Sequence, residues 1–289
     1  MPKLILLPVR GQASDAPAYA TALAAARLFD GHISVLHVRP DVQRDVAALA
    51  AADMGMATGL EATLTRLEVE ANAREQAAVA AWRGFAGRNA IVLEDRPGTP
   101  GLSTEFLTET GNEADWVAEH GRTVDLVVAG RGESGSALDV IEAALLDTGK
   151  PVLIAAAAVP TSGPTLDGTV AIAWKDCKEA AAAVSAALPF IRRAGRVLIF
   201  TVDEGADQAD RSPARLAHAL RWHNGNVAVK LLPKDTRPPA TALLAAVTSI
   251  GCDLLVMGGY GHARLREAVF GGFTLAVLDD APLPVLMAH

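Results

Sequence analysis

The sequence predicts an α/β protein of two similar units, each with a five-stranded, mostly parallel sheet and helices on both of its faces. Short, continuously apolar runs suit strands that are buried on both faces, as they are in a parallel sheet. Alanine-rich helical stretches alternate with these runs, which is typical of an α/β sheet. The same order of strands and helices then occurs a second time along the chain, which indicates a duplication.

The first unit opens with a strand, a helix and a second strand, which are predicted at 4–9 (LILLPV), 16–29 and 33–38 (ISVLHV). Elements in this order form a βαβ unit, whose crossover should be right-handed. The later strands of this unit are predicted at 90–93, 125–130 and 151–154, with a helix at 112–119.

A long stretch from Asp41 to Gly84 has no counterpart of similar length in the second unit. Its part from Thr58 to Trp82 favours a helix and contains no proline. The apolar side of that helix would consist of Leu60, Leu64, Leu67 and Val69. We therefore predict a helical insertion that covers the ligand face of the first unit or contacts another chain.

The second unit follows a linker at 159–164 (VPTSGP), where turn residues replace any periodicity. Its strands are predicted at 169–174, 196–202, 226–232, 253–258 and 284–288, and its helices at 180–188 and 240–250. The segment 253–258 matches 125–130 almost residue for residue, and 284–288 matches 151–155. The domains expected from this repeat are 1–158 and 167–289.

A duplicated unit that would otherwise form a dimer can satisfy its interface within one chain. We predict an intramolecular pseudo-dimer with an approximate twofold axis, in which strand 152–154 faces strand 285–287. Pairing these strands would also remove two exposed sheet edges, which are an aggregation hazard. A further homodimer and an unidentified protein partner are both compatible with this arrangement.

Composition and charge exclude several classes of function. The chain of 289 residues has a formal net charge of -7, so no basic surface for nucleic acid is expected. The sequence has no apolar run long enough to span a membrane, and its first residues lack the pattern of a signal peptide, which favours the cytoplasm. Cys177 and Cys252 are far apart and the histidines show no ligand spacing, so no metal site is predicted.

The strongest local signal lies in the second unit, where Gly258-Gly259-Tyr260-Gly261 precedes a second cluster, Gly271-Gly272-Phe273-Thr274. The motif begins at the end of a predicted parallel strand, where ligands of open α/β sheets bind. Glycine lets backbone N–H groups approach an anion, and the helix predicted at 274–280 would point its N-terminus at the same place. The same glycines would also suffice to form turns and start a helix, and spacing alone does not separate these interpretations.

This G-x2-G-x9-G pattern, together with the run from Met257 to Glu267, resembles the ATP-binding loop of universal stress proteins. The order of strands and helices also agrees with that family in both halves. The fold implied is two tandem universal-stress-like units, which are flavodoxin-like and adenine nucleotide alpha hydrolase-like. In the family, adenine and ribose lie near the ends of strands one and two, and the phosphates lie on the glycine loop. The nucleotide-binding residues implied by the resemblance are Ala173, Trp174, Lys175, Val202, Met257, Gly258, Gly261, Gly271, Gly272, Phe273 and Thr274.

Two positions depart from the family pattern. Gly272 replaces the usual Ser or Thr after the last motif glycine, and the acidic residue after strand one is Lys175 in the second half and Arg10 in the first. A cation cannot accept a hydrogen bond from a ribose hydroxyl, so Lys175 would either meet a phosphate or remain solvated. Trp174 stands where it can line a base pocket.

The first unit has a different glycine loop, Gly130-Arg131-Gly132-Glu133-Ser134-Gly135. A dinucleotide-binding loop would follow the first strand rather than the fourth, and Ser134 lacks the context of a nucleophile elbow. A dinucleotide enzyme or a hydrolase therefore ranks last. Where the second glycine cluster should recur, the chain has Ile141-Glu142-Ala143-Ala144, so we expect nucleotide binding in the second half alone.

The resemblance implies a cytoplasmic stress-response protein that binds ATP or another adenine nucleotide in its C-terminal half. The alternative is a nucleotide-free scaffold that acts through contacts with proteins or small apolar ligands. No nucleophile, general-base pair or metal-ligand set is recognised, so catalysis is expected to be absent or limited to slow ATP hydrolysis. Neither a nucleic acid nor a membrane is expected as a partner.

Overall fold

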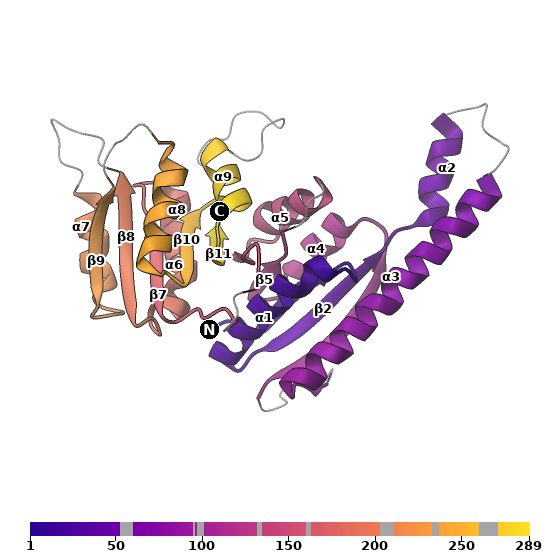
Figure 1. The fold of residues 1–289 in the computed structure, drawn as a ribbon, viewed down its shortest axis with the longest axis horizontal. Coiled ribbons are helices and arrows are strands. Elements are labelled where there is room, and N and C mark those ends of the chain that lie inside the picture. Colours follow the sequence, from indigo (N-terminus) through magenta and orange to yellow (C-terminus); the bar gives the residue numbers. More distant parts are fainter. Residues whose placement is uncertain are drawn as a thin grey trace.

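The computed structural model describes residues 1–52, 60–94, 96, 101–131, 135–159, 163–202, 211–232, 237–259 and 271–289. Within these residues, a single 11-stranded sheet runs through both halves of the chain (Figure 1). The first half contributes β1 (Leu4–Val9), β2 (His32–Arg39), β3 (Val92–Leu93), β4 (Ser103–Thr110), β5 (Leu126–Ala129) and β6 (Val152–Ile154). The second half contributes β7 (Thr169–Ala173), β8 (Arg196–Val202), β9 (Val227–Leu232), β10 (Leu254–Gly258) and β11 (Val285–Ala288).

Helices cover both faces of this sheet. One buried hydrophobic cluster includes residues of α1 (Ala16–Phe29), α3 (Leu60–Asn89), α6 (Lys178–Ile191) and α7 (Ser212–Leu220). A second cluster includes residues of α4 (Glu113–Gly121), α5 (Gly135–Asp147), α8 (Pro239–Ile250) and α9 (Gly272–Asp280). The remaining helices are the short η1 (Ala13–Asp15) and α2 (Val42–Ala52). The α/β layering predicted from the alternating pattern is therefore confirmed.

The strand order is the same when it is followed outward from the centre in either direction. The order across the sheet is β3-β4-β2-β1-β5-β6-β11-β10-β7-β8-β9. Outward from the centre, between β6 and β11, each half has its fifth, fourth, first, second and third main strands in that order. β6 and β11 meet at the centre as an antiparallel pair with Leu153 opposite Leu286. All other strand pairs among the described residues are parallel. The predicted pairing of 152–154 with 285–287 is confirmed, and the halves form an intramolecular pseudo-dimer.

Asp125 and Asp253 form equivalent hydrogen bonds in the two halves. Asp125 Oδ2 accepts the backbone N–H groups of Lys3 at 2.7 Å and Leu4 at 3.0 Å. Asp253 Oδ2 accepts the backbone N–H of Thr169 at 2.7 Å. Each aspartate precedes the fourth main strand of its half and ties it to the start of the first strand. The matched segments of the sequence therefore have matched structural roles.

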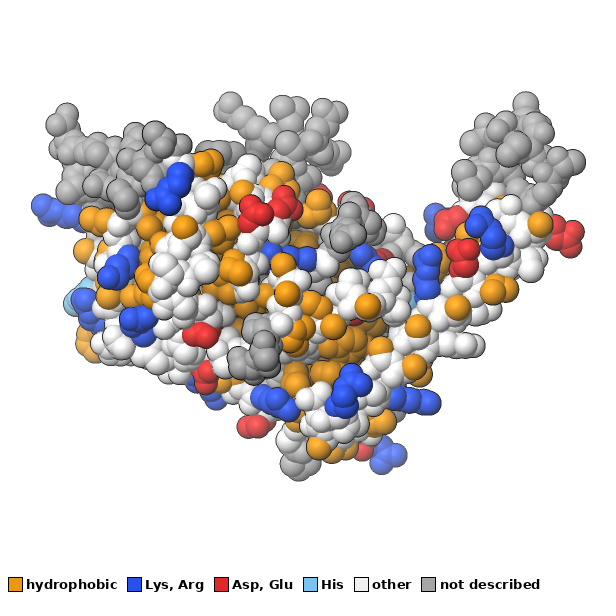
Figure 2. Space-filling view, in the orientation of Figure 1, with side chains coloured by type: hydrophobic (Ala, Val, Ile, Leu, Met, Phe, Trp, Pro, Cys, Tyr) orange, Lys and Arg blue, Asp and Glu red, His pale blue; other side chains and the backbone are white. Residues whose placement is uncertain are grey.

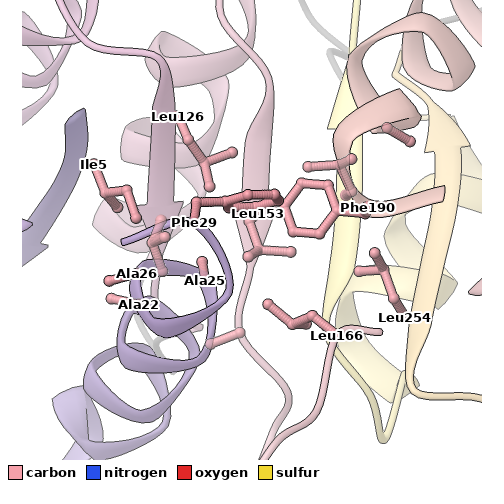
Figure 3. Close-up of a cluster of buried hydrophobic side chains, with 14 of the residues drawn as sticks. Ile5, Ala22, Ala25, Ala26, Phe29, Leu126, Leu153, Leu166, Phe190 and Leu254 are labelled. Atoms are coloured by element: carbon pink, nitrogen blue, oxygen red, sulfur yellow. The ribbon is translucent and has the colours of Figure 1, made fainter. Parts of the chain in front are cut away.

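One hydrophobic core continues across the junction between the halves (Figure 3). Phe29 at the end of α1 and Phe190 near the end of α6 form an edge-to-face contact, with ring centroids 4.9 Å apart. Leu153 of β6 and Leu166 of the segment between the halves are buried in the same cluster. Because aromatic rings from both halves share this core, the halves should unfold together.

The third main strand of the first unit differs from the prediction. The run predicted at 90–93 forms only the two-residue edge strand β3, and the place beside β2 is taken by β4. β4 (STEFLTET) has no continuous apolar run. Its buried Thr104 is satisfied because its hydroxyl donates to Ile33 O at 2.7 Å. The first half therefore has six strands rather than the five predicted.

The long insertion is helical, as predicted, over α2 and α3; residues 53–59 between them lie outside the described part. The C-terminal portion of α3 packs on the body of the first half through the buried Ala78 and Phe85. Its middle crosses the loop after β1, where a Cβ on Gly11 would lie 2.9 Å from Ala78 N. The remainder of α3 projects away from the sheet together with α2 (Figure 1). We call α2 and residues 60–77 of α3 the arm.

The surface carries charges of both signs. Figure 2 shows Lys and Arg side chains interspersed with Asp and Glu over the face in view, so no single-sign patch dominates that face. Among the described residues, no helix combines the length and the apolar character that a bilayer span requires.

Candidate functional site

Three parallel neighbours, β7, β8 and β10, end at the same edge of the second half of the sheet. Ala173, the last residue of β7, lies opposite Met257 in β10 and is also paired with β8. The carboxyl ends of parallel strands form the usual binding edge of an open α/β sheet. The backbone therefore brings together Trp174, Val202 and Gly258, which the sequence placed in one site.

Trp174 follows β7 directly and forms part of the wall at this edge. Its backbone N–H donates to Phe200 O at 2.8 Å, and its indole Nε1 donates to Ser212 Oγ at 3.0 Å. Because the indole N–H is used within the protein, the ring surface is the part that remains to contact a ligand. The next residue, Lys175, is exposed, which is compatible with both of its predicted roles.

Packing within the protein explains Gly258, and the backbone of Gly259 is used in hydrogen bonds within the protein. A Cβ on Gly258 would lie 2.6 Å from Ala180 N, so only glycine lets β10 end against the start of α6. The Gly259 N–H donates to Ala288 O at 2.8 Å, which extends the β10–β11 pairing. The Gly259 carbonyl oxygen is 3.2 Å from His289 Nδ1. The Gly259 N–H is therefore committed and cannot also donate to an anion.

Helix α9 has a first turn that no described residue caps or covers. Its N-cap, Gly271, is extended with no side chain to accept the first N–H groups, and the first turn holds no acidic residue. Neither Gly271 nor Gly272 has a positive φ, and a Cβ on either would have no neighbour within 4 Å. Packing within the part of the chain that the structure describes does not require glycine at these positions. Free N–H groups and the helix dipole favour an anion at such a place.

Two further implied residues belong to the same first turn. Thr274 is buried, and Phe273 is exposed. Gly261 lies in the segment 260–270, outside the described residues, as do Gly132, Glu133 and Ser134 of the first-half loop. The described part of the candidate nucleotide site thus consists of the ends of β7, β8 and β10 and the start of α9.

The comparisons with known proteins bear on this half first. Residues 168–289 match the model of the universal stress protein family. The C-terminal half belongs to the universal stress protein family. This is the half that carries the glycine motif, and the resemblance inferred from that motif is confirmed. No curated protein matches the chain.

Solved structures extend the fold to the whole chain. A universal stress protein from Archaeoglobus fulgidus DSM 4304 is 18% identical, covers 99% of this chain and 95% of its own, and superposes with a TM-score of 0.68. A putative universal stress protein from Pseudomonas aeruginosa UCBPP-PA14 is 14% identical, with coverages of 99% and 93% and a TM-score of 0.56. The whole chain therefore has the fold of two universal-stress-like units in tandem.

The first half differs from the second half at the helix before the last strand. α5 and α9 are equivalent, because each ends on an aspartate, Asp147 or Asp280, that stands four residues before a proline, Pro151 or Pro284. Gly272 lies eight residues before Asp280, so its counterpart is Asp139, eight residues before Asp147.

The prediction that Ile141-Glu142-Ala143-Ala144 replaces the second glycine cluster is therefore wrong. Ile141 and Ala144 are buried inside α5, which begins at Gly135. Asp139 lies within the helix rather than at its start, so its N–H is engaged in the helical ladder. The first half thus has no open helix terminus at the position that Gly272 occupies in the second half.

The structure also gives surroundings to the charged residues of the first half, among which Glu113 is one that the sequence did not single out. Arg10 Nε donates to Glu113 Oε2 at 2.8 Å, so the cation that follows the first strand is paired with the start of α4. Burial is the largest influence on Glu113 and raises the pKa of its carboxyl, whereas Arg10 lowers it. Arg131 lies partly buried at the end of β5. No group of three or more His, Cys, Asp or Glu suited to a metal ion occurs among the described residues.

Proposed function

We propose that the C-terminal universal stress protein domain binds an adenine nucleotide such as ATP. The observation that carries this proposal is the open first turn of α9, where Gly271 and Gly272 have no steric or conformational need to be glycine. A phosphate can approach backbone N–H groups closely at such a turn. The base would lie against the Trp174 ring and the end of β8.

Affinity is expected to be modest. Gly272 offers no hydroxyl to a phosphate, and Lys175 cannot accept a hydrogen bond from ribose. Each missing hydrogen bond costs on the order of 1 kcal/mol. In this proposal the nucleotide acts as a signal in a cytoplasmic stress response, and hydrolysis is slow or absent because no residue is assigned as nucleophile or general base.

Isothermal titration calorimetry with ATP tests the proposal on the wild type, on Gly271→Asp and on a control, Gly225→Asp. Aspartate at the N-cap should preserve or slightly stabilise α9, but its carboxylate should repel phosphate and weaken ATP binding by roughly tenfold or more. Gly225 is exposed, has no positive φ and has no neighbour within 4 Å of a Cβ, so its variant should bind like the wild type. Two nucleotides per chain, or binding unchanged in Gly271→Asp, would contradict the proposal.

A nucleotide-free scaffold is the second candidate, and the projecting arm favours it. Among the described side chains of the arm, Val42, Val46 and Ala71 are buried against one another, and Val69 is exposed. Such a feature suits contact with another protein or with a second copy of the chain. If the wild type binds no ATP at millimolar concentration, this function becomes the preferred one.

A further inference from the structure

A cavity of about 1120 Å³ lies where the first half meets α9 of the second half. It is bounded by the residues that follow β1, β5 and β6, by the first two turns of α5 and by the C-terminal end of α9. Its apolar wall includes Pro8, Pro17, Leu138, Ile141, Ala156 and Leu278. The cavity is separate from the first turn of α9, because only the C-terminal end of that helix borders it.

Most charged groups on the cavity wall already have partners. Arg10 is paired with Glu113 at 2.8 Å. Asp15 Oδ2 accepts the backbone N–H groups of Arg10 and Gln12, each at 3.0 Å. These groups form the rim of the β1 loop and hold one another in place.

Arg131 has a partner for only one of its three guanidinium nitrogens among the described residues. Its Nη1 donates to Ala281 O at 2.9 Å, just beyond the C-terminus of α9. Its Nε and Nη2 are buried and have no hydrogen-bond partner among the described residues. These two nitrogens form one edge of the guanidinium, the edge that binds a carboxylate through two parallel hydrogen bonds. Buried donors without an acceptor destabilise a protein, so an acceptor at this edge would be stabilising.

The charge on Arg131 persists at neutral pH. Burial lowers the pKa of its guanidinium to about 10, while Asp279 and Asp280 oppose that shift. The cavity wall as a whole carries two cations, Arg10 and Arg131, and three carboxylates, Asp15, Glu113 and Asp279. The wall thus has one more carboxylate than cations, which disfavours a triphosphate. A ligand with a single negative charge would be attracted only through the unpartnered edge of Arg131.

We infer that this cavity is a binding site for a small organic acid with an apolar body. The acid's carboxylate accepts hydrogen bonds from Arg131 Nε and Nη2, and its body lies on the apolar wall between the halves. The site occurs once per chain, because the position equivalent to Arg131, directly after the glycine at the end of the fourth main strand, is Gly259 in the second half.

The test uses octanoate as the probe and octan-1-ol, which lacks the carboxylate, as its matched control. Calorimetry on the full-length protein should give one octanoate per chain and binding of the alcohol that is weaker by about tenfold or more. Arg131→Met should weaken octanoate by a similar factor. Arg131→Lys keeps a positive charge without the two-nitrogen edge and should show an intermediate loss. Arg215→Met, an exposed arginine of α7, should bind like the wild type.

A second readout remains informative if a variant folds poorly. In ¹⁵N-labelled protein, the Nε–H resonance of Arg131 is identified as the one that disappears in Arg131→Lys. This resonance should shift when octanoate is added to the wild type. Gly271→Asp should leave octanoate binding unchanged, which separates this site from the proposed nucleotide site. Equal binding of the acid and the alcohol, an unshifted Nε–H resonance, displacement of octanoate by ATP, or no octanoate binding at millimolar concentration would overturn the inference.

Discussion

Two glycines of the same motif, Gly258 at the end of β10 and Gly272 at the start of α9, differ in what surrounds them. A Cβ on Gly258 would meet backbone atoms of Ala180 and Glu179 at 2.6 and 2.7 Å, and these atoms belong to a helix that is fixed by its own core. A Cβ on Gly272 would meet nothing within 4 Å. Identical residues in one motif therefore serve different purposes, the first in packing and the second at an open surface.

This difference predicts opposite effects of the same substitution. Gly258→Ala should lower the free energy of unfolding by about 2 kcal/mol, because β10 or α6 must move to admit the methyl group. Gly272→Ala should be neutral or slightly stabilising, because alanine is the better helix former. Urea denaturation of both variants measures the difference. Equal destabilisation by the two substitutions would mean that the α9 turn is packed as tightly as the end of β10.

The two parts of helix α3 differ in how firmly they are packed. Its C-terminal portion is anchored by Phe85, whose ring lies 4.7 Å from that of Tyr19. The arm rests instead on Val42, Val46 and Ala71, with Arg39 paired to Glu68 at 2.6 Å where the arm leaves the body. Few buried apolar contacts imply a low free energy of local opening.

Hydrogen exchange should therefore be faster in α2 and residues 60–70 than in residues 78–89. Val46→Asp should speed exchange in the arm further while leaving the melting temperature of the body nearly unchanged. Phe85→Ala, which removes a buried ring from the body, should instead lower the free energy of unfolding by about 3 kcal/mol or more. Uniform hydrogen exchange along the whole of α3 would contradict a difference in local stability between its two parts.

The elements that the sequence predicted well are those whose burial is continuous. β1, β5 and β10 are covered on both faces and consist of uninterrupted apolar residues, so their positions could be read directly. β4 was missed because it lies next to the sheet edge and buries Thr104, whose hydroxyl is satisfied by Ile33 O. Burial of a satisfied hydroxyl leaves no apolar signal in the sequence.

The candidate site was predictable only in part, for the same physical reason. Motif spacing located the ends of β7 and β10 and the start of α9. It could not locate Arg131 as a cavity residue, since that cavity forms only when α9 of one half closes over the loops of the other. These contacts join segments that are far apart in the sequence, so a local sequence pattern does not predict them.

At the scale of the whole molecule, the two halves behave as one body. The sheet is continuous through β6 and β11, and Phe29 packs against Phe190 across the junction. The arrangement places a shared core where two independent domains would have a hydrated interface.

Cooperative unfolding follows from this shared core. Trp82 in the first half and Trp174 in the second can serve as separate fluorescence probes in variants that keep only one of them. Both probes should report the same urea midpoint, and Phe190→Ala should shift both midpoints together, with a loss of about 3 kcal/mol or more. The control Leu231→Ala changes an exposed residue of the edge strand β9 and should shift neither. Two distinct midpoints in the wild type would show that the halves are energetically independent.

The antiparallel junction of β6 and β11 also has a genetic consequence. In a homodimer with this symmetry, one codon specifies both copies of every position, so a substitution that benefits one binding site is imposed on the other. Here the equivalent positions 131 and 259 have separate codons, and they hold arginine and glycine. Covalent fusion thus frees each half to evolve its own chemistry while the quaternary geometry is inherited unchanged.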